Sequence, residues 1–418
     1  MSNQQHPCMK SELSLFDPPM TQVTMEHASW VDVHPIASLE GNGPIEFNYV
    51  TGQDDYLDLN NTELFLKLKI VKSDGTALAA TDKPSVANLP IASIFSDVTL
   101  TLGDTVVEGG HHLYPYKAFM SSVLQFDKSM KKTQLLAAGY EDDTTEREKW
   151  FTTSSSHEFQ GPLYLDMCSQ SKYLLPGVNV RVKLTRSKAE FFVLNSGKKD
   201  VKIVLEQAAL FIRRVKVDPS VLLAHVMGLQ RANALYPIQQ TDMTSYTVAQ
   251  GTKNHLQDNL FRGQLPKLVV VGLVSNDSFN GDMKKDPMLF EHFNLCQLAL
   301  YRDGEPVPYS QPLQMDFDNK LVTRAYMMMI QSLEMYNCNV SNGITLDDFI
   351  SKGKTLFVFN LTPDLSASGA CGQPYRTGNI RLEMKFAKSL PSAINVVLLS
   401  LRDGCVEITK HRQVIKCS

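Results

Sequence analysis

The sequence lacks a long apolar run, an excess of charge of one sign and a signal-like start. No stretch approaches the roughly 20 apolar residues of a membrane-spanning helix, and segment 1–19 is polar and carries prolines. We therefore expect no membrane span and no secretory signal peptide. The 41 Lys and Arg against 44 Asp and Glu give a formal net charge of −3, which argues against binding nucleic acid through a broad basic surface.

Cysteine is sparse and shows no pairing pattern. The seven cysteines are odd in number, widely spread and contain no C-x-x-C pair: Cys8, Cys168, Cys296, Cys338, Cys371, Cys405 and Cys417. A disulfide framework would be denser and usually even in number. We therefore predict reduced thiols in a chain that is synthesised inside a cell and not secreted.

Motifs of nucleotide binding and catalysis are also missing. The sequence contains neither G-x-x-x-x-G-K-[ST] nor G-x-G-x-x-G, and neither H-E-x-x-H nor G-x-S-x-G. Three adjacent carboxylate pairs remain: Asp54-Asp55, Asp142-Asp143 and Asp347-Asp348. Because neighbours on a strand point to opposite faces, such pairs rarely converge on one ligand. We interpret them as solvated loop residues.

Two further groups could suggest chemistry. His111-His112 follows two glycines, without a second ligand at a spacing typical of metal sites, so we predict a loop or helix entry. Ser154–Ser156 beside His157 reads as a polar loop before a strand, because a catalytic triad is defined by geometry rather than by adjacency. The sequence thus predicts no catalytic, cofactor-binding or metal residues, and a protein that is not an enzyme.

Local basic clusters could in principle contact nucleic acid. They are Lys131-Lys132, Lys198-Lys199, Arg213-Arg214 with Lys216, and Lys410, His411, Arg412 and Lys416 near the C-terminus. We favour an outward polar face and a strand end over contact with nucleic acid. The three methionines Met327–Met329 favour soft packing in a core or subunit contact.

The sequence does contain many short segments with strand character. Apolar residues alternate at period two, or form short runs rich in β-branched residues, in segments 45–50, 63–71, 98–102, 178–185, 201–217, 268–274, 295–301, 355–360, 379–386 and 394–401. Glycine turns at 102–104, 302–304 and 402–404 each predict a hairpin. The composition, 43% hydrophobic and 20% charged, is that of a globular chain, and 418 residues suit two domains.

Helical periodicity is confined to a few segments. We predict helices at 113–125, 133–138, 219–232, 321–336 and 346–350. Asp218 is the expected N-cap of the third, and Pro219 its first helical residue. The sequence therefore predicts a mainly β protein with a few inserted short helices.

The chain also contains an internal repeat. Asn179-Val180-Arg181-Val182 matches Asn379-Ile380-Arg381-Leu382, at an offset of 379 − 179 = 200. Three weaker matches, in the same order, pair Phe95 with Phe293, Lys117 with Arg324 and the strand from Leu64 with that from Leu268. Their offsets are 198, 207 and 204. We infer two copies of one unit, related by this nearly constant offset.

The repeated unit has too many short strands to hide its apolar faces in one sheet. Two sheets packed face to face solve this problem, and the eight-stranded jelly roll is such a fold. We predict tandem jelly-roll β-sandwiches, with an N-terminal arm at 1–40, a first jelly roll at 41–217, a connector helix at 218–233 and a second jelly roll at 234–418.

Several segments resemble a known family. Segments 45–47, 55–60 and 63–68 are similar to the opening of double jelly-roll major capsid proteins of the Polinton (Maverick) and adintovirus group. Segments 95–103 and 114–119 resemble the hairpin and helix of that family. Segments 395–401, 406–408 and 412–415 resemble its closing strands, so the likeness runs from about residue 12 to the C-terminus.

The resemblance implies a function in assembly. Members of that group form homotrimers whose six jelly rolls make a pseudo-hexagonal capsomer, and these capsomers tile an icosahedral shell. It implies a virion location, penton or minor capsid proteins as partners, and at most weak contact with packaged double-stranded DNA. The alternatives are a minor or vertex capsid protein, a ligand-binding, for example carbohydrate-binding, β-sandwich, and a domesticated host protein that keeps the fold and has lost assembly.

The N-terminal segment suggests a contact between subunits. Segment 1–35 includes prolines at 18, 19 and 35 and has little periodicity and a lone Trp30. We predict an extended arm that reaches a neighbouring subunit or lies under the shell, with Trp30 as its apolar anchor.

Overall fold

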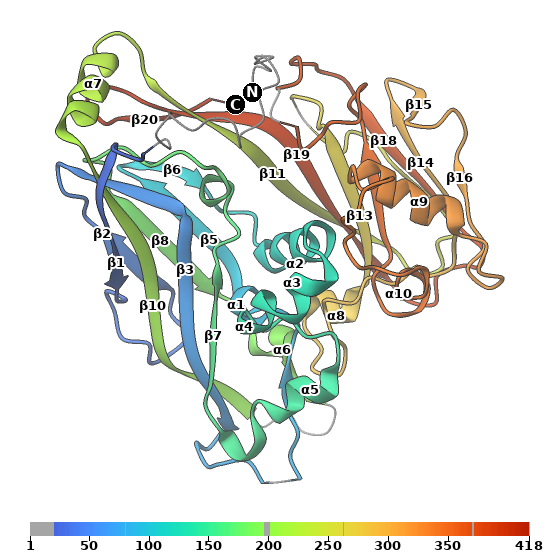
Figure 1. The fold of residues 1–418 in the computed structure, drawn as a ribbon. Coiled ribbons are helices and arrows are strands. Elements are labelled where there is room, and N and C mark those ends of the chain that lie inside the picture. Colours follow the sequence, from blue (N-terminus) through green and yellow to red (C-terminus); the bar gives the residue numbers. More distant parts are fainter. Residues whose placement is uncertain (1–20, 80, 196–200, 262, 370–371, 418) are drawn as a thin grey trace, which may run out of the picture.

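The computed structural model describes residues 21–79, 81–195, 201–261, 263–369 and 372–417. It confirms the mainly β class: antiparallel strands form two sandwiches, with short helices at their edges and between them (Figure 1). None of the helices within the described residues is long and apolar enough to cross a membrane.

The first sandwich consists of two four-stranded sheets. One has the order β1-β10-β3-β7, from Met25–Val33, Val201–Val217, Asp55–Lys72 and His157–Pro162. The other has the order β2-β8-β5-β6, from Ile45–Tyr49, Val180–Arg186, Phe95–Leu102 and Thr105–Glu108. The short strands β4 (Ser85–Val86) and β9 (Val193–Leu194) pair separately.

The second sandwich repeats this arrangement. Its sheets have the orders β11-β19-β13-β17, from Ala234–Val248, Ile394–Ile408, Leu268–Ser275 and Leu356–Asn360, and β12-β18-β14-β15, from Asn254–Gln257, Ile380–Phe386, Leu295–Arg302 and Glu305–Val307. Two short strands extend it, β16 (Leu313–Gln314) beside β14 and β20 (Val414–Cys417) beside β19. Each sheet of the second sandwich therefore corresponds strand by strand to a sheet of the first. The order β11-β19-β13-β17 corresponds to β1-β10-β3-β7, and β12-β18-β14-β15 corresponds to β2-β8-β5-β6.

The repeated asparagines have the same structural task in both sandwiches. The backbone carbonyl of Asn179 accepts a hydrogen bond from Gly103 N (2.8 Å), and that of Asn379 accepts one from Asp303 N (2.9 Å). Their side-chain oxygens accept from the backbone N–H groups of Thr51 (3.3 Å) and Asn259 (3.2 Å). Each asparagine therefore fastens a hairpin turn and a neighbouring loop, which accounts for the repeat at an offset of 200.

Strand register corrects one of the weaker matches. Phe95 pairs with Arg186, and Leu295 pairs with Phe386. Both offsets are 200 (295 − 95 and 386 − 186), so Phe95 corresponds to Leu295 and not to Phe293. Phe293 lies in the preceding turn with a positive φ of 44°.

The predicted hairpin at 402–404 is wrong. β19 continues through these residues to Ile408, because the long strand β11 pairs with it over its whole length, with Ile238 opposite Gly404. The chain turns later, where Thr409 N donates to Gln413 O (3.0 Å). The other two predicted hairpins join β5 to β6 and β14 to β15.

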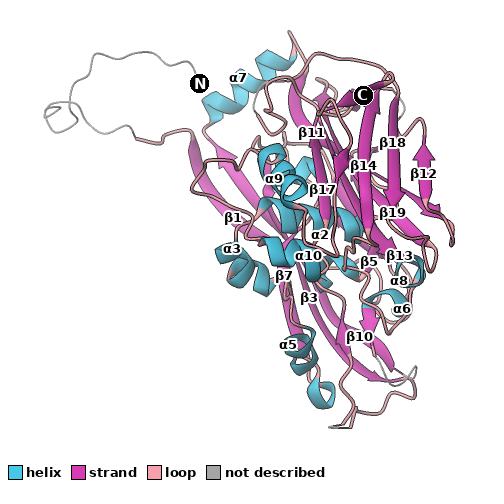
Figure 2. Ribbon diagram, turned by 90° about the vertical axis from the view of Figure 1, so that its right-hand side faces the viewer, coloured by secondary structure: helices cyan, strands magenta, loops and turns pink. Residues whose placement is uncertain are grey.

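Ten α-helices occur in the described part of the chain, and most are very short. They are α1 (Pro90–Ser93), α2 (Tyr114–Gln125), α3 (Lys128–Lys132), α4 (Gln134–Ala137), α5 (Thr144–Lys149), α6 (Ala189–Phe192), α7 (Pro219–Leu229), α8 (Asn276–Asn280), α9 (Thr323–Ser332) and α10 (Leu346–Ser351). Short 3₁₀ turns occur at Thr152–Ser154 and Asp166–Ser169. Figure 2 shows α7 at one end of the molecule and α5 at the other.

The predicted connector is α7. As predicted, Asp218 caps it, since its carboxylate accepts from Ser220 N (2.8 Å), and Pro219 is its first residue. The helix ends at Leu229, before the predicted end at residue 232. It leads from β10 into β11, and Leu229 is its one buried residue. The domain boundaries stay a prediction, because one continuous hydrophobic core spans both sandwiches.

The predicted N-terminal arm is wrong for its C-terminal part. Residues Met25–Val33 form β1, which pairs with β10 of the same chain. Only Val33 of this strand is buried, so its sequence carries little of the alternation that identifies a strand. Residues 1–20 lie outside the described part of the chain.

Candidate functional site

The adjacent carboxylates do not form a catalytic pair. Asp55 is buried at the start of β3, and its carboxylate lies 3.5 Å from the Arg214 guanidinium. Asp58, further along the same strand, binds Arg213 at 2.7 Å. The prediction of a solvated loop is therefore wrong for Asp55, because two arginines of β10 neutralise carboxylates of the neighbouring strand.

The other two pairs act at helix starts. Asp143 caps α5, since its carboxylate accepts from Thr145 N at 2.8 Å. Asp348 forms a capping box with Thr345, whose hydroxyl accepts from Asp348 N at 3.1 Å. A carboxylate near a helix N-terminus satisfies free backbone N–H groups. These residues are structural rather than merely solvated.

The histidine pair lies in the loop before α2, as predicted. His112 has a positive φ of 53°, and burial lowers the pKa of His111. Among the described residues, no three His, Cys, Asp or Glu side chains are placed to hold a metal ion.

The serine and histidine side chains of 154–157 have separate partners. Ser154 Oγ accepts from Leu78 N (2.9 Å), and Ser156 Oγ donates to the Glu206 carboxylate (2.7 Å). His157 opens β7 and stacks on Trp150, with ring centroids 5.2 Å apart. A nucleophile and base are not brought together here.

Three members of the basic clusters, Lys131, Arg213 and Arg214, have partners within the chain. Lys131 is buried, and its Nζ donates to the backbone carbonyls of Val123 and Asn342, at 2.6 Å each. Burial lowers its pKa to about 8. Lys198 and Lys199 lie outside the described residues. Contact with nucleic acid stays a prediction, and the ion pairs of β10 favour the structural interpretation.

The described cysteines are free thiols, although Cys405 and Cys417 stand opposite each other on β19 and β20. Cys168, Cys296, Cys338, Cys405 and Cys417 are free, while Cys8 and Cys371 lie outside the described residues. Burial raises the pKa of the Cys168 thiol far above its usual value. Such a thiol is inert and packs as a small apolar group.

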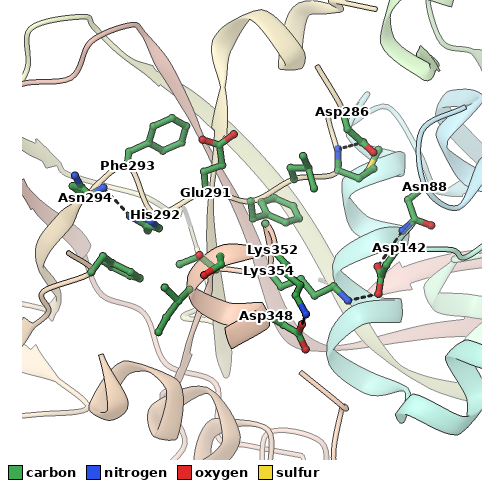
Figure 3. Close-up of a pocket in the computed structure, with 18 of the residues that line it drawn as sticks. Asn88, Asp142, Asp286, Glu291, His292, Phe293, Asn294, Asp348, Lys352 and Lys354 are labelled. Atoms are coloured by element: carbon green, nitrogen blue, oxygen red, sulfur yellow. Dashed lines mark hydrogen bonds and ion pairs between the residues drawn. The ribbon is translucent and has the colours of Figure 1, made fainter. Parts of the chain in front are cut away.

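A large cavity of about 1160 Å³ lies where the two sandwiches meet. It is lined from the first sandwich by Asn88 and Asp142, and from the second by segments 286–294 and 348–355. Figure 3 shows Lys354 reaching across to Asp142, and Lys352 pairing with Asp348 at 2.9 Å. These charged groups of the cavity neutralise one another instead of converging on a ligand.

One arginine ties the two sandwiches together beside this cavity. Arg147 of α5 is buried and binds the Asp286 carboxylate at 2.9 Å. A second of its nitrogens donates to the carbonyl of Val86 (2.5 Å). Removing one partner of such a pair would leave an uncompensated buried charge, so Arg147 and Asp286 depend on each other across the contact between the sandwiches.

A buried ion network joins the sandwiches at a second point. Lys117 of α2 binds Glu108 and Asp166, the latter at 2.7 Å. The other oxygen of Asp166 accepts from Thr241 N of β11 at 2.8 Å. Burial raises the pKa of the Glu108 carboxyl, although Lys117 opposes the shift. Sequence reasoning missed this network, because its members are far apart in the chain.

A second feature missed from the sequence is an exposed aromatic patch, formed by Trp30, Phe65 and Phe211. Phe65 and Phe211 touch across β3 and β10, with ring centroids 6.0 Å apart, and both are half-buried. Trp30 of β1 is 53% exposed. The signal in the sequence was Phe65 itself, an aromatic residue on the polar side of the alternation Glu63, Phe65, Lys67. The polar groups described above thus hold the fold together, whereas this open surface exposes aromatic side chains.

Comparison with known protein sequences finds a relative but no family model. No protein-family model matches the chain. An uncharacterized protein of Caenorhabditis elegans, F54H12.2, is 24% identical over 392 residues, which cover 89% of this chain and 93% of that protein.

Solved virus structures resemble the chain over nearly its whole length. A chain of the Sputnik virophage has a TM-score of 0.66 at 11% identity, covering 100% of this chain and 94% of that one. A chain of the PBCV-1 virus capsid has a TM-score of 0.61 at 9% identity, covering 96% and 99%. The mavirus major capsid protein has a TM-score of 0.55 at 10% identity, covering 100% and 94%. The chain therefore has the double jelly-roll fold found in capsid proteins of virophages and large DNA viruses.

Proposed function

We propose that this chain is a major capsid protein, which assembles as a homotrimer and then into an icosahedral shell. The observation that carries the proposal is the duplication of one sandwich within a chain that matches virus capsid chains from end to end. Two equivalent sandwiches per chain give six per trimer. Six similar units can surround an axis at nearly equal steps, and such a capsomer tiles a shell.

The polar chemistry of the chain supports a structural role. The carboxylates and bases singled out from the sequence cap helices, pair across strands or join the two sandwiches. They hold one rigid shape, which is what a repeated building block requires. We propose that the protein works through its surfaces and not through a catalytic site.

We further propose the Polinton and adintovirus group as its source. The likeness to the mavirus major capsid protein and the nematode relative both support this assignment, since copies of such elements integrate into animal genomes. The virion would be its location, with penton proteins as partners and at most weak contact with packaged DNA. Two sandwiches per chain favour a major over a vertex capsid protein.

Electron microscopy tests the proposal directly. The purified full-length chain is imaged by negative stain over a range of salt concentration and pH. We expect hexagonal particles with three-fold symmetry, and closed shells under some conditions. Fields that contain only single double-lobed particles, under every condition, would contradict the proposal.

A further inference from the structure

The two sandwiches meet through one insert and one sheet. The first insert (residues 109–156, between β6 and β7) carries α2, and ten of the twelve residues of α2 are buried. Its Leu124 lines a small cavity together with Leu268 and Leu399 of the sheet β11-β19-β13-β17. A Cβ added at Gly272 of this sheet would lie 2.9 Å from Met120 Cε. The first insert therefore covers the outer face of the second sandwich's sheet.

The second sandwich has an equivalent insert whose helix is less covered within the described chain. The second insert (residues 308–355, between β15 and β17) carries α9 at the place of α2, and only four of its ten residues are buried. Leu321, Tyr336 and Val340, on either side of α9, are 68%, 52% and 59% exposed. The second insert therefore leaves large apolar side chains exposed on both sides of its helix, and exposed apolar surface of this kind is typical of a contact surface.

The first sandwich has the equivalent sheet, and its outer face is open. Trp30 stands opposite Arg213, and Asp32 stands opposite Phe211. Residues that stand opposite each other share a face, and so do residues two apart on one strand. Trp30 therefore points to the same face as Arg213 and Phe211. Phe65 touches Phe211 there, so the aromatic patch lies on the sheet that corresponds to the one under α2.

We propose that the aromatic patch of one copy receives the second insert of another copy of this chain. Within the chain, the first insert and the second sheet are already joined. The remaining pair is the second insert and the first sheet, and it can form only between copies. Repeating the internal contact between copies continues the same rotation, so three chains would close a ring of six sandwiches. The inference rests on the proposed self-assembly and names the surfaces that carry it.

The two equivalent sheets differ in burial as this contact between copies requires. Strand β13, whose sheet is covered within the chain, is a nearly continuous apolar run in which seven of eight residues are buried. A face that is covered only in an oligomer must stay soluble during synthesis, so it mixes aromatic side chains with charges. Lys67 and Glu158, 3.3 Å apart, are such charges on the open face. Tryptophan is among the residues most enriched at the energetic centres of interfaces.

Site-specific photo-cross-linking of the full-length chain tests the contact. A benzoylphenylalanine replaces Phe65, and a matched control replaces Leu256, an exposed residue of β12 in the second sandwich. We expect the label at 65 to yield a covalent dimer whose cross-linked peptide lies within 308–355. The label at 256 should not reach that insert. A dimer cross-linked from position 65 through any other peptide would overturn the proposal.

Substitution gives an independent readout. Trp30→Glu places a charge in the patch, and Leu256→Glu places one on an equally exposed apolar residue elsewhere. We expect the trimer dissociation constant to rise about tenfold or more for the first variant, and to change little for the second, with unchanged far-UV circular dichroism for both. A folded Trp30→Glu variant that trimerises like the wild type would contradict the proposal.

The outcomes separate this inference from the proposed function. A wild-type chain that is trimeric, but cross-links from 65 to another region, overturns the docking surface and leaves self-assembly intact. A wild-type chain that stays monomeric overturns both.

Discussion

The two equivalent sheets of this chain differ in what covers them. In β13 of the second sandwich nearly every residue is buried, because the sandwich interior covers one face and α2 covers the other. In β3 of the first sandwich, buried and half-buried residues alternate from Leu64 to Ile70, because one face is open. A sheet covered on both faces has continuous apolar strands, whereas a sheet with one wet face alternates. The sequence of each strand therefore reports how its sheet is packed within the chain.

The largest effect should come from breaking the ion network under the covered face. Lys117→Met leaves Glu108 and Asp166 buried together without their cation. An uncompensated buried charge costs about 3–5 kcal/mol, so we expect a loss of that size in the free energy of unfolding, measured in urea at neutral pH. Lys183→Met is the control, since its pair with Glu46 is exposed and 3.6 Å long. Equal losses for both variants would contradict the network's role.

The stability of the contact between the sandwiches should also depend on alkaline pH through Lys131, whose Nζ donates to the Asn342 carbonyl of the second sandwich. Burial lowers the pKa of Lys131 from 10.5 to about 8, so the folded state disfavours its charged form. Between these values the unfolded state binds more protons, and stability should rise with pH. We expect wild type to gain up to about 3 kcal/mol relative to Lys131→Met across this pH range, measured by urea unfolding. A difference between the two proteins that does not change with pH would contradict this assignment.

A smaller loss should follow from crowding the covered face. Gly272→Val places methyl groups against Phe290 and Met120. The nearest atoms of these two side chains are 2.6 Å and 2.9 Å from the position of the added Cβ. Overpacking of this kind costs about 1–3 kcal/mol. Gly228→Val in α7 is the control, because a Cβ there meets nothing within 4 Å. Thermal unfolding of the two variants should differ clearly, and matching transitions would show that α2 does not press on this face.

The smallest effect is expected on the open face. Lys67→Met removes the exposed pair with Glu158. Exposed ion pairs contribute about 0–1 kcal/mol, so unfolding of the variant at low protein concentration should be close to that of wild type. A loss as large as that of Lys117→Met would show that this face is packed within the single chain, and the two sheets would then not differ as described.

Much of the fold was predictable from strand periodicity and from the internal repeat. Segment 201–217 was predicted with its observed bounds, since its ends are marked by a polar stretch and by Asp218-Pro219. β1 was missed because an edge strand with a single buried residue shows no clear period. The turn at 402–404 was placed wrongly because Asp403-Gly404 has hairpin composition, while the partner strand β11 keeps the chain extended.

The candidate site was predictable only in part. Trp30 could be singled out as an exposed apolar residue, but its neighbours Phe65 and Phe211 come from strands that are distant in the sequence. The ion network between the sandwiches could not be predicted for the same reason. Lys117, Asp166 and Thr241 are brought together only in the completed fold. Local patterns specify strands and turns, whereas contacts across large sequence separations depend on the completed fold.

The mass of the full-length chain in solution, measured by light scattering across a concentration series, tests self-assembly most directly. We expect a species of three times the chain mass of 46.8 kDa, which gives way to larger particles as conditions favour assembly. A mass of 46.8 kDa at every concentration, salt and pH would contradict the proposed function.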